Sequence, residues 1–221
     1  MNILFFVLIY LIAISIPGLL YLASLGGIAL LATDPHAVSV VLGTTAFAVF
    51  STQFLLAAKP RIALSALGTK GLLSFHGTMA IIALILAIVH KTLKEDVLGF
   101  PDDTVQTGFG KAAAAIFFIA IVLAAFLMAN TFWMRFSILK GFKQRVYAAF
   151  SLSYPRMRII HNITVIGGVL ILFHVLLAST SDFSANPLGS LWVAGWMLFC
   201  LGAYGRYRLV GRKGSVMGIA R

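Results

Sequence analysis

Four of the five histidines in this chain form a regular pattern inside two long apolar segments. His76 and His90 are 14 residues apart in one segment, and His161 and His174 are 13 residues apart in the other. An ionisable side chain inside a bilayer is costly and marks a functional site by default. Two imidazoles at equal depth on facing helices can supply both axial ligands of a low-spin haem, and such cofactors lie in bundle cores. The pattern therefore predicts two haem sites, one at each level.

The spacing within each pair decides which way the rings point. In an α-helix, 14 residues span about 21 Å and make about 3.9 turns, so His76 and His90 face nearly the same way. Thirteen residues make about 3.6 turns, which leaves the second pair about 140° apart on an ideal helix. We therefore expect local overwinding near Gly167 and Gly168, or haems approached from different angles. These glycines and Gly77 either make room for a flat macrocycle or serve ordinary membrane-helix packing.

The remaining sequence has to position these histidines in a membrane. Of its 221 residues 61% are hydrophobic and 10% charged, whereas soluble domains are about 45–50% apolar and about 25% charged. We expect an all-α membrane protein, a single domain over residues 1–221 that forms a six-transmembrane-helix bundle, with the first helix bent at Pro17. A span needs roughly 20 apolar residues, and six segments qualify: residues 3–25, 37–58, 71–92, 112–134, 158–180 and 188–207.

The charges orient the predicted bundle. Fourteen of the 17 basic residues follow the second, fourth and sixth segments, whereas all six acidic residues are on the opposite side. The positive-inside rule makes the basic side and both termini cytoplasmic, in a multi-pass protein of the inner or plasma membrane. The third and fifth helices then both run outward. His76 and His161 would ligate an inner haem iron, and His90 and His174 an outer one.

Composition also excludes several classes of protein. The net charge of +11 would suggest nucleic acid in a soluble protein, but here the basic residues flank spans, so lipid is the expected partner and nucleic acid is not. The single cysteine, Cys200, excludes a disulfide framework and a multi-cysteine iron–sulfur or zinc site. We expect it to be packed and inert.

The two histidine segments resemble those of a known family. HGTMAIIALILAIVH and HNITVIGGVLILFH, in the third and fifth of six helices, are similar to the ferric reductase-like transmembrane domain superfamily. That group includes the NADPH oxidases, iron and copper reductases, and the haem membrane subunit of the bacterial methionine sulfoxide reductase system. The stretch PRMRIIH, which runs into His161, also resembles the beginning of the family's fifth helix. The resemblance covers all six helices, and its specific part is the four histidines.

The resemblance implies two b-type haems that carry electrons from the cytoplasm to an acceptor outside. In that frame Arg156 and Arg158, with Lys70 as a further candidate, would contact the inner-haem propionates, and Lys91 and Lys94 would serve the outer haem. The alternative for all five is membrane topology or snorkelling. Three aromatic residues of the last helix either pack beside a haem or fill an ordinary packing or interfacial role: Trp192, Trp196 and Phe199.

The members with flavin and nicotinamide domains carry them after the sixth helix, and this sequence has no G-x-G-x-x-G motif for such a domain. We expect the electrons to come from a separate cytoplasmic flavoprotein, a bound flavin, a quinol or a domain outside this chain. The basic stretches Arg135–Arg158 and Arg206–Arg221 form a candidate docking face for that donor.

Three functions stay open at this point. The first is a transmembrane oxidoreductase that reduces a ferric or cupric chelate or oxygen outside; the four acids between Lys94 and Asp103 attract such metal ions, or are acidic only through topology. The second is a haem membrane subunit that passes electrons to a periplasmic reductase. The third is a non-redox transporter or proton channel with histidine relays. A relay predicts acids among the histidines, and none of the six lies in a predicted span; His36 is expected to be structural.

Overall fold

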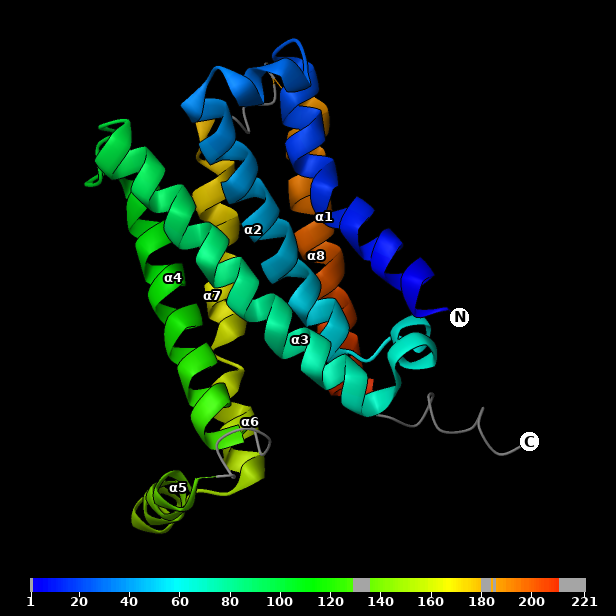
Figure 1. Ribbon diagram of the computed structural model, residues 1–221, viewed down its shortest axis with the longest axis vertical. Helices are drawn as coiled ribbons and strands as arrows, with labels where there is room; N and C mark the ends of the chain where they lie inside the picture. The colour runs from blue at the N-terminus through cyan, green and yellow to red at the C-terminus, as the bar shows by residue number, and fades with distance from the viewer. Residues whose placement is uncertain (1, 129–135, 180–183, 185, 211–221) are drawn as a thin grey trace.

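The structure, a computed structural model, describes residues 2–128, 136–179, 184 and 186–210 (Figure 1). Those residues form helices and no strand, and six helical segments are long and apolar enough to cross a membrane. The helices are α1 (Ile3–Ser24), α2 (Pro35–Ala57), α3 (Arg61–Thr92), α4 (Val105–Leu123), α5 (Ser137–Ala149), α6 (Tyr154–His161), α7 (Thr164–Leu176) and α8 (Pro187–Val210). A 3₁₀ turn, η1 (Ile28–Ala32), follows α1, and π turns extend α3 as η2 (Leu93–Val97) and α4 as η3 (Ala124–Met128).

Each of the six predicted segments overlaps one spanning helix, and the differences lie at the ends. The predicted third helix begins at residue 71, and α3 is interrupted just before it, at Gly68, where φ is 64°. The π turn η2 carries the third span on to Val97. It contains Glu95 and Asp96, so the prediction that every acidic residue lies outside the spans is wrong for these two. Residues 129–134 and 180, the last of the predicted fourth and fifth segments, lie outside the described residues.

Short polar side chains and prolines set several helix boundaries. Asp34 and Ser153 lie directly before α2 and α6, and each side chain accepts a hydrogen bond from a backbone N–H of the first turn. In both helices a proline follows at the start, where its missing N–H does not matter. Pro17 lies inside α1, where it removes an internal hydrogen bond, and α1 changes direction along its length (Figure 1).

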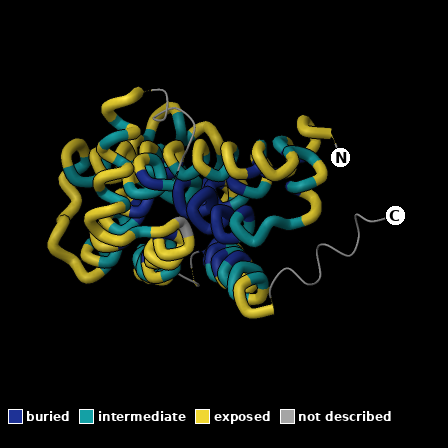
Figure 2. The backbone as a smooth tube through the Cα atoms, turned by 90° about the horizontal axis from the view of Figure 1, so that it is seen from below, coloured by how far each residue is buried: buried dark blue, intermediate teal, exposed yellow. Residues whose placement is uncertain are grey.

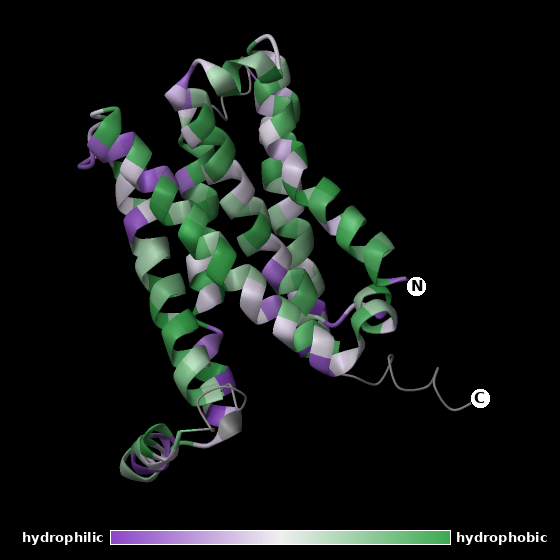
Figure 3. Cartoon of the chain, in the orientation of Figure 1, coloured by the Kyte–Doolittle hydropathy of each residue, from purple (hydrophilic) through white to green (hydrophobic). Residues whose placement is uncertain are grey.

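Helix α2 is the centre of the bundle. It is the most buried span, and its segment from Ala46 to Gln53 is buried on all sides, as expected of a helix that is apolar all round. It packs against α1, α3 and α8, and α7 packs mainly against α4. Figure 2 shows the buried residues gathered in the middle of the molecule, and Figure 3 shows the hydrophobic residues along the spans. The two histidine-bearing helices, α3 and α7, therefore rest on different neighbours.

The second histidine helix is overwound directly before its glycine pair. The backbone N–H groups of residues 162, 163, 165 and 166 each donate to the carbonyl three residues earlier, at 3.0 Å. This 3₁₀ pattern turns about 120° per residue, against about 100° in an α-helix, so four or five such residues add about 80–100°. Most of the 140° mismatch between His161 and His174 is removed at this junction between α6 and α7. The overwinding expected near Gly167 thus lies a few residues before it.

The orientation of the bundle stays a prediction from its charges, and cysteine labelling tests it. In a chain with Cys200→Ala, a membrane-impermeant maleimide should label Asp103→Cys on intact cells, because residue 103 follows the third span. Gln144→Cys, in α5 after the fourth span, should react only after the cells are opened, because a basic connection stays inside. The opposite result would invert the bundle.

Candidate functional site

The structure brings the four intramembrane histidines together as two pairs. The ring centres of His76 and His161 are 6.5 Å apart, and the rings are turned 71° to each other. At the other level the ring centres of His90 and His174 are 6.4 Å apart, and the rings are turned 80°. Each pair takes one ring from α3 and one from α6 or α7, which is the pairing that the sequence predicts.

The separation of the rings fits two imidazoles bound to one metal ion. A metal–imidazole bond is about 2.0–2.1 Å long and a ring centre lies about 1.2 Å behind its nitrogen, so axial imidazoles on one ion have centres about 6.4–6.6 Å apart. No group of three or more His, Cys, Asp or Glu side chains suitable for a metal gathers among the described residues. Two histidines per level suit a metal whose other positions are filled by a macrocycle.

The outer histidines are fixed by backbone carbonyls of neighbouring helices. Nδ1 of His90 donates to the carbonyl of Ser39 on α2 at 2.8 Å, and Nδ1 of His174 donates to the carbonyl of Gln106 on α4 at 2.9 Å. Histidines that bind metals nearly always donate their second ring nitrogen in this way, because the bond fixes the tautomer and ring orientation. In both rings Nε2 is left as the unprotonated nitrogen.

A glycine on each supporting helix makes this approach feasible. A Cβ atom at Gly43 would lie 2.7 Å from Nδ1 of His90, and one at Gly110 would lie 2.7 Å from Nδ1 of His174. Gly43 follows Ser39 by four residues and Gly110 follows Gln106 by four, so each glycine exposes the carbonyl one turn before it. The sequence analysis missed all four residues; a glycine inside an apolar span was the available signal.

The outer pair opens into a large pocket between four helices. The pocket encloses about 1530 Å³ when the open solvent at its mouth is included, and residues of α2, α3, η2, α4 and α7 line it. Three ammonium groups line its outer part, those of Lys91, Lys94 and Lys111. At its other end lie Phe50 and Phe117, whose rings are stacked with centres 4.2 Å apart and an angle of 8°. The same two rings line the inner pocket, so they separate the two levels.

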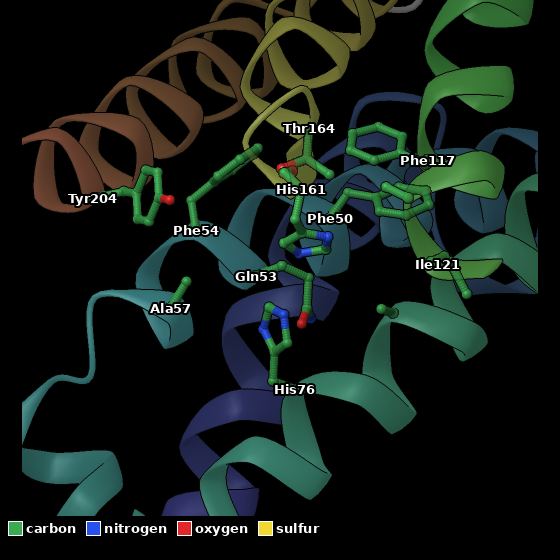
Figure 4. Close-up of a pocket in the computed structure, with 12 residues that line it drawn as sticks. Phe50, Gln53, Phe54, Ala57, His76, Phe117, Ile121, His161, Thr164 and Tyr204 are labelled. Atoms are coloured by element: carbon green, nitrogen blue, oxygen red, sulfur yellow. The ribbon is translucent and has the colours of Figure 1, made fainter. Parts of the chain in front are cut away.

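The inner pair lies in a smaller pocket of about 490 Å³ that Gln53 and Tyr204 also line (Figure 4). Four buried polar atoms make no hydrogen bond of good geometry within the described residues: Tyr10 Oη, Gln53 Oε1, His76 Nδ1 and His161 Nδ1. Two of them do face a polar neighbour, Gln53 for Tyr10 and the Ala120 carbonyl for His161. Buried polar atoms without partners are rare in folded proteins, and three of these four belong to residues that line one pocket.

The glycines selected from the sequence do not line a slot between the histidines. A Cβ atom at Gly167 would lie 3.2 Å from the Phe117 ring, and one at Gly168 would lie 2.8 Å from the Phe54 ring. Gly77 is exposed, and a Cβ atom there would meet nothing within 4 Å. The first two glycines admit aromatic rings of the protein itself, and Gly77 makes no such room.

The structure does not bring the cations predicted to contact the inner-haem propionates to the inner pocket. Arg156, Arg158 and Lys70 are exposed, and none of them lines it. The Arg156 guanidinium donates to the carbonyl of Ser151. A role for these residues beside a haem propionate stays a prediction from the resemblance.

Lys91 and Lys94 line the outer pocket, and their predicted role beside an outer haem stays a prediction. Lys91 pairs with Glu95, and Nζ of Lys94 lies 2.6 Å from Nε2 of His36, which fits the expected structural role of that histidine. Lys111, which the sequence analysis did not select, donates to Asp102 at 2.7 Å and lowers the pKa of that carboxyl. This ion pair is therefore lost only when the pH falls through the lowered pKa.

The three aromatic residues of α8 that the sequence singled out, Trp192, Trp196 and Phe199, line neither pocket. Trp192 and Trp196 are stacked with ring centres 5.3 Å apart, and Nε1 of Trp196 donates to Oγ1 of Thr52 at 3.3 Å. Phe199 is exposed, and Cys200 is fully buried in the same cluster. The sequence left open whether these residues lie beside a haem or pack within the bundle, and the two tryptophans pack within the bundle.

Neither a family of known proteins nor a curated protein matches this sequence. The function is therefore argued from the geometry of the site.

Alanine at Gly43 or Gly110 should weaken haem binding by the outer histidine pair and leave the inner pair unaffected. In Gly43→Ala or Gly110→Ala the new methyl group displaces the imidazole from its carbonyl, and loss of such a supporting bond lowers metal affinity about 10–100-fold. With the two haems that the sequence predicts, haem content after purification from haem-supplied cells should fall from two per chain toward one. Gly108→Ala on α4 is the matched control, because a Cβ atom there meets nothing within 4 Å. Equal haem content in all three variants would refute the role of Gly43 and Gly110 in positioning the outer histidines.

Proposed function

We propose that this chain is a di-haem, b-type transmembrane electron-transfer protein of the ferric reductase-like type, located in the inner or plasma membrane. The observation that carries the proposal is the pair of facing histidines at each of two levels, with ring centres 6.5 and 6.4 Å apart. In this proposal His76 and His161 hold the inner iron, and His90 and His174 hold the outer iron.

Three features of the chain fit a haem at these positions. The ring separations suit bis-imidazole ligation, and no third His, Cys, Asp or Glu of the described residues joins either pair to form a metal site. The carbonyls of Ser39 and Gln106 fix the outer rings in the tautomer that leaves Nε2 free for a metal. His76 and His161 both line one pocket, so there is space beside the inner pair as well.

A bound haem supplies a one-electron carrier at each level. The residues of the chain position these carriers and exclude water between them: the stacked rings of Phe50 and Phe117 separate the two pockets. At the outer mouth Lys91 and Lys111 pair with Glu95 and Asp102, whereas Lys94 lies beside His36 and makes no ion pair among the described residues. The Lys94 ammonium is therefore the candidate partner for an anionic group, whether a haem carboxylate or an incoming acceptor.

The proposal needs an electron donor and an acceptor. For the donor we propose a cytoplasmic flavoprotein, since haems carry electrons but take no hydride from a nicotinamide themselves. For the acceptor we propose a small species, a ferric or cupric chelate or oxygen, because the outer pocket is wide and open to the loop that begins at Phe100. Transfer to a periplasmic reductase is the alternative, and purified partner proteins distinguish the two.

The geometry disfavours a proton relay. Between the two histidine levels the pockets are lined by apolar side chains such as Leu84, Ile171 and the stacked phenylalanines, and by no ionisable residue of the described chain. Glu95 lines the outer pocket but pairs with Lys91. A relay needs titratable groups or water between its stations, and the stacked rings occupy that space.

An optical spectrum is the first test of the proposal. The purified protein should show a Soret band that shifts on addition of dithionite, with the sharp reduced bands of bis-imidazole haem, and should contain two haems per chain. Absence of a dithionite-dependent band in protein from haem-supplied cells would refute the proposal, and one haem per chain would refute its two-site form.

Substitution of the outer ligands tests the assignment of each pair. His90→Ala or His174→Ala should leave one haem per chain and stop electron transfer across proteoliposomes, because the outer iron loses an axial ligand. His36→Ala removes the one histidine outside the pairs and should keep both haems. Transfer at the full rate in His90→Ala would show that the pairing is wrong.

A further inference from the structure

Helix α5 connects the fourth and fifth spans, and its sequence SILKGFKQRVYAA is amphipathic. At 100° per residue Ile138, Leu139, Phe142, Val146 and Ala149 all fall within about 100° of one another. The helix thus has one continuous apolar face. From the sequence, this stretch is predicted only as part of a basic docking face for the electron donor.

The charges of α5 border the apolar face instead of opposing it. Lys143 and Arg145 lie about 70–90° to either side of its middle, whereas Gln144 is directed to the opposite side. Lys140 lies farther toward the polar side. The helix has three basic residues and no acidic residue.

The described protein does not cover the apolar face. Ile138 is 84% exposed and Phe142 is 58% exposed, and Phe150, directly after the helix, is 71% exposed. Large apolar side chains exposed together mark an interaction surface. The question is which material covers them.

The position of α5 indicates what covers its apolar face, because a hydrogen bond holds the helix at the end of a membrane span. The Tyr147 hydroxyl donates to the carbonyl of Leu127 at 2.7 Å, and Leu127 lies in the last π turn of the fourth span. On the other side only residues 150–153 connect α5 to α6, so the fifth span begins within about 17 Å of its end. Figure 1 shows α5 beyond the end of α4, with its axis turned away from that of α4. The helix is thus held beside the ends of the fourth and fifth spans, where the spans meet the surface of the lipid.

We propose that α5 is an interfacial helix that buries its apolar face in the bilayer leaflet at the basic end of the bundle, with Lys143 and Arg145 binding anionic lipid headgroups. A short amphipathic helix with apolar aromatic residues and flanking cations lies in the interface plane in this way, and juxtamembrane basic residues are attracted to anionic lipid. The proposal rests on α5 alone and holds whether or not the histidines bind haem.

Nitroxide labels on opposite sides of α5 test the proposal in the full-length protein. The single buried cysteine is removed by Cys200→Ala, and a label is placed at Phe142→Cys or at Gln144→Cys. In nanodiscs of phosphatidylcholine and phosphatidylglycerol, the label at 142 should be more accessible to oxygen than to a water-soluble nickel chelate. The label at 144, two residues away, should show the reverse order.

A second measurement separates lipid charge from general burial. With Lys143→Gln and Arg145→Gln together, the label at 142 should move toward the aqueous phase in discs with phosphatidylglycerol and stay unchanged in discs of phosphatidylcholine alone. Equal nickel accessibility at 142 and 144 would overturn the proposal. So would a label at 142 shielded from both reagents, because a protein partner or a second chain would then cover the face. Haem content, measured on the same samples, reports separately on the proposed function.

Discussion

The candidate site depends on how helix backbones hold the histidine rings apart. An imidazole on one helix can donate to a carbonyl of the next only where that carbonyl is open, and a glycine one turn later provides the opening. Ser39 and Gly43 do this for His90, and Gln106 and Gly110 do it for His174. The two supporting helices, α2 and α4, therefore set the distance between the rings, since α3 packs on α2 and α7 packs on α4.

The two levels of the site differ in the hydrogen bonds that the protein makes to the histidine rings. The outer rings have both position and tautomer fixed by the protein, whereas Nδ1 of His76 and of His161 lie buried without a good hydrogen bond among the described residues. The outer pocket is also the larger of the two and opens at a mouth lined by lysines. In the proposal both pockets hold a resident haem, and this mouth gives a soluble acceptor access to the outer one.

Glycine has two separate uses in the spans. At Gly43 and Gly110 it opens a backbone carbonyl to a histidine, and at Gly167 and Gly168 it admits the rings of Phe117 and Phe54. Gly77 faces open space and has neither use. A glycine's position next to a histidine in the sequence therefore does not show whether that glycine makes room for a ring. The ring that needs the space comes from another helix.

The sequence by itself determined the six spans, because apolar length and charge placement report on the membrane without reference to tertiary contacts. It also determined the pairing of His76 with His161 and of His90 with His174, because helix rise converts residue spacing into depth. Only the tertiary structure decided what surrounds the rings: the carbonyls of Ser39 and Gln106, the stacked phenylalanines, and the overwound junction that aligns His174. It also placed Glu95 in the third span and gave α5 an uncovered apolar face. These features depend on the rotation and separation of neighbouring helices, and a hydrophobic pattern carries neither quantity when lipid and protein interior are equally apolar.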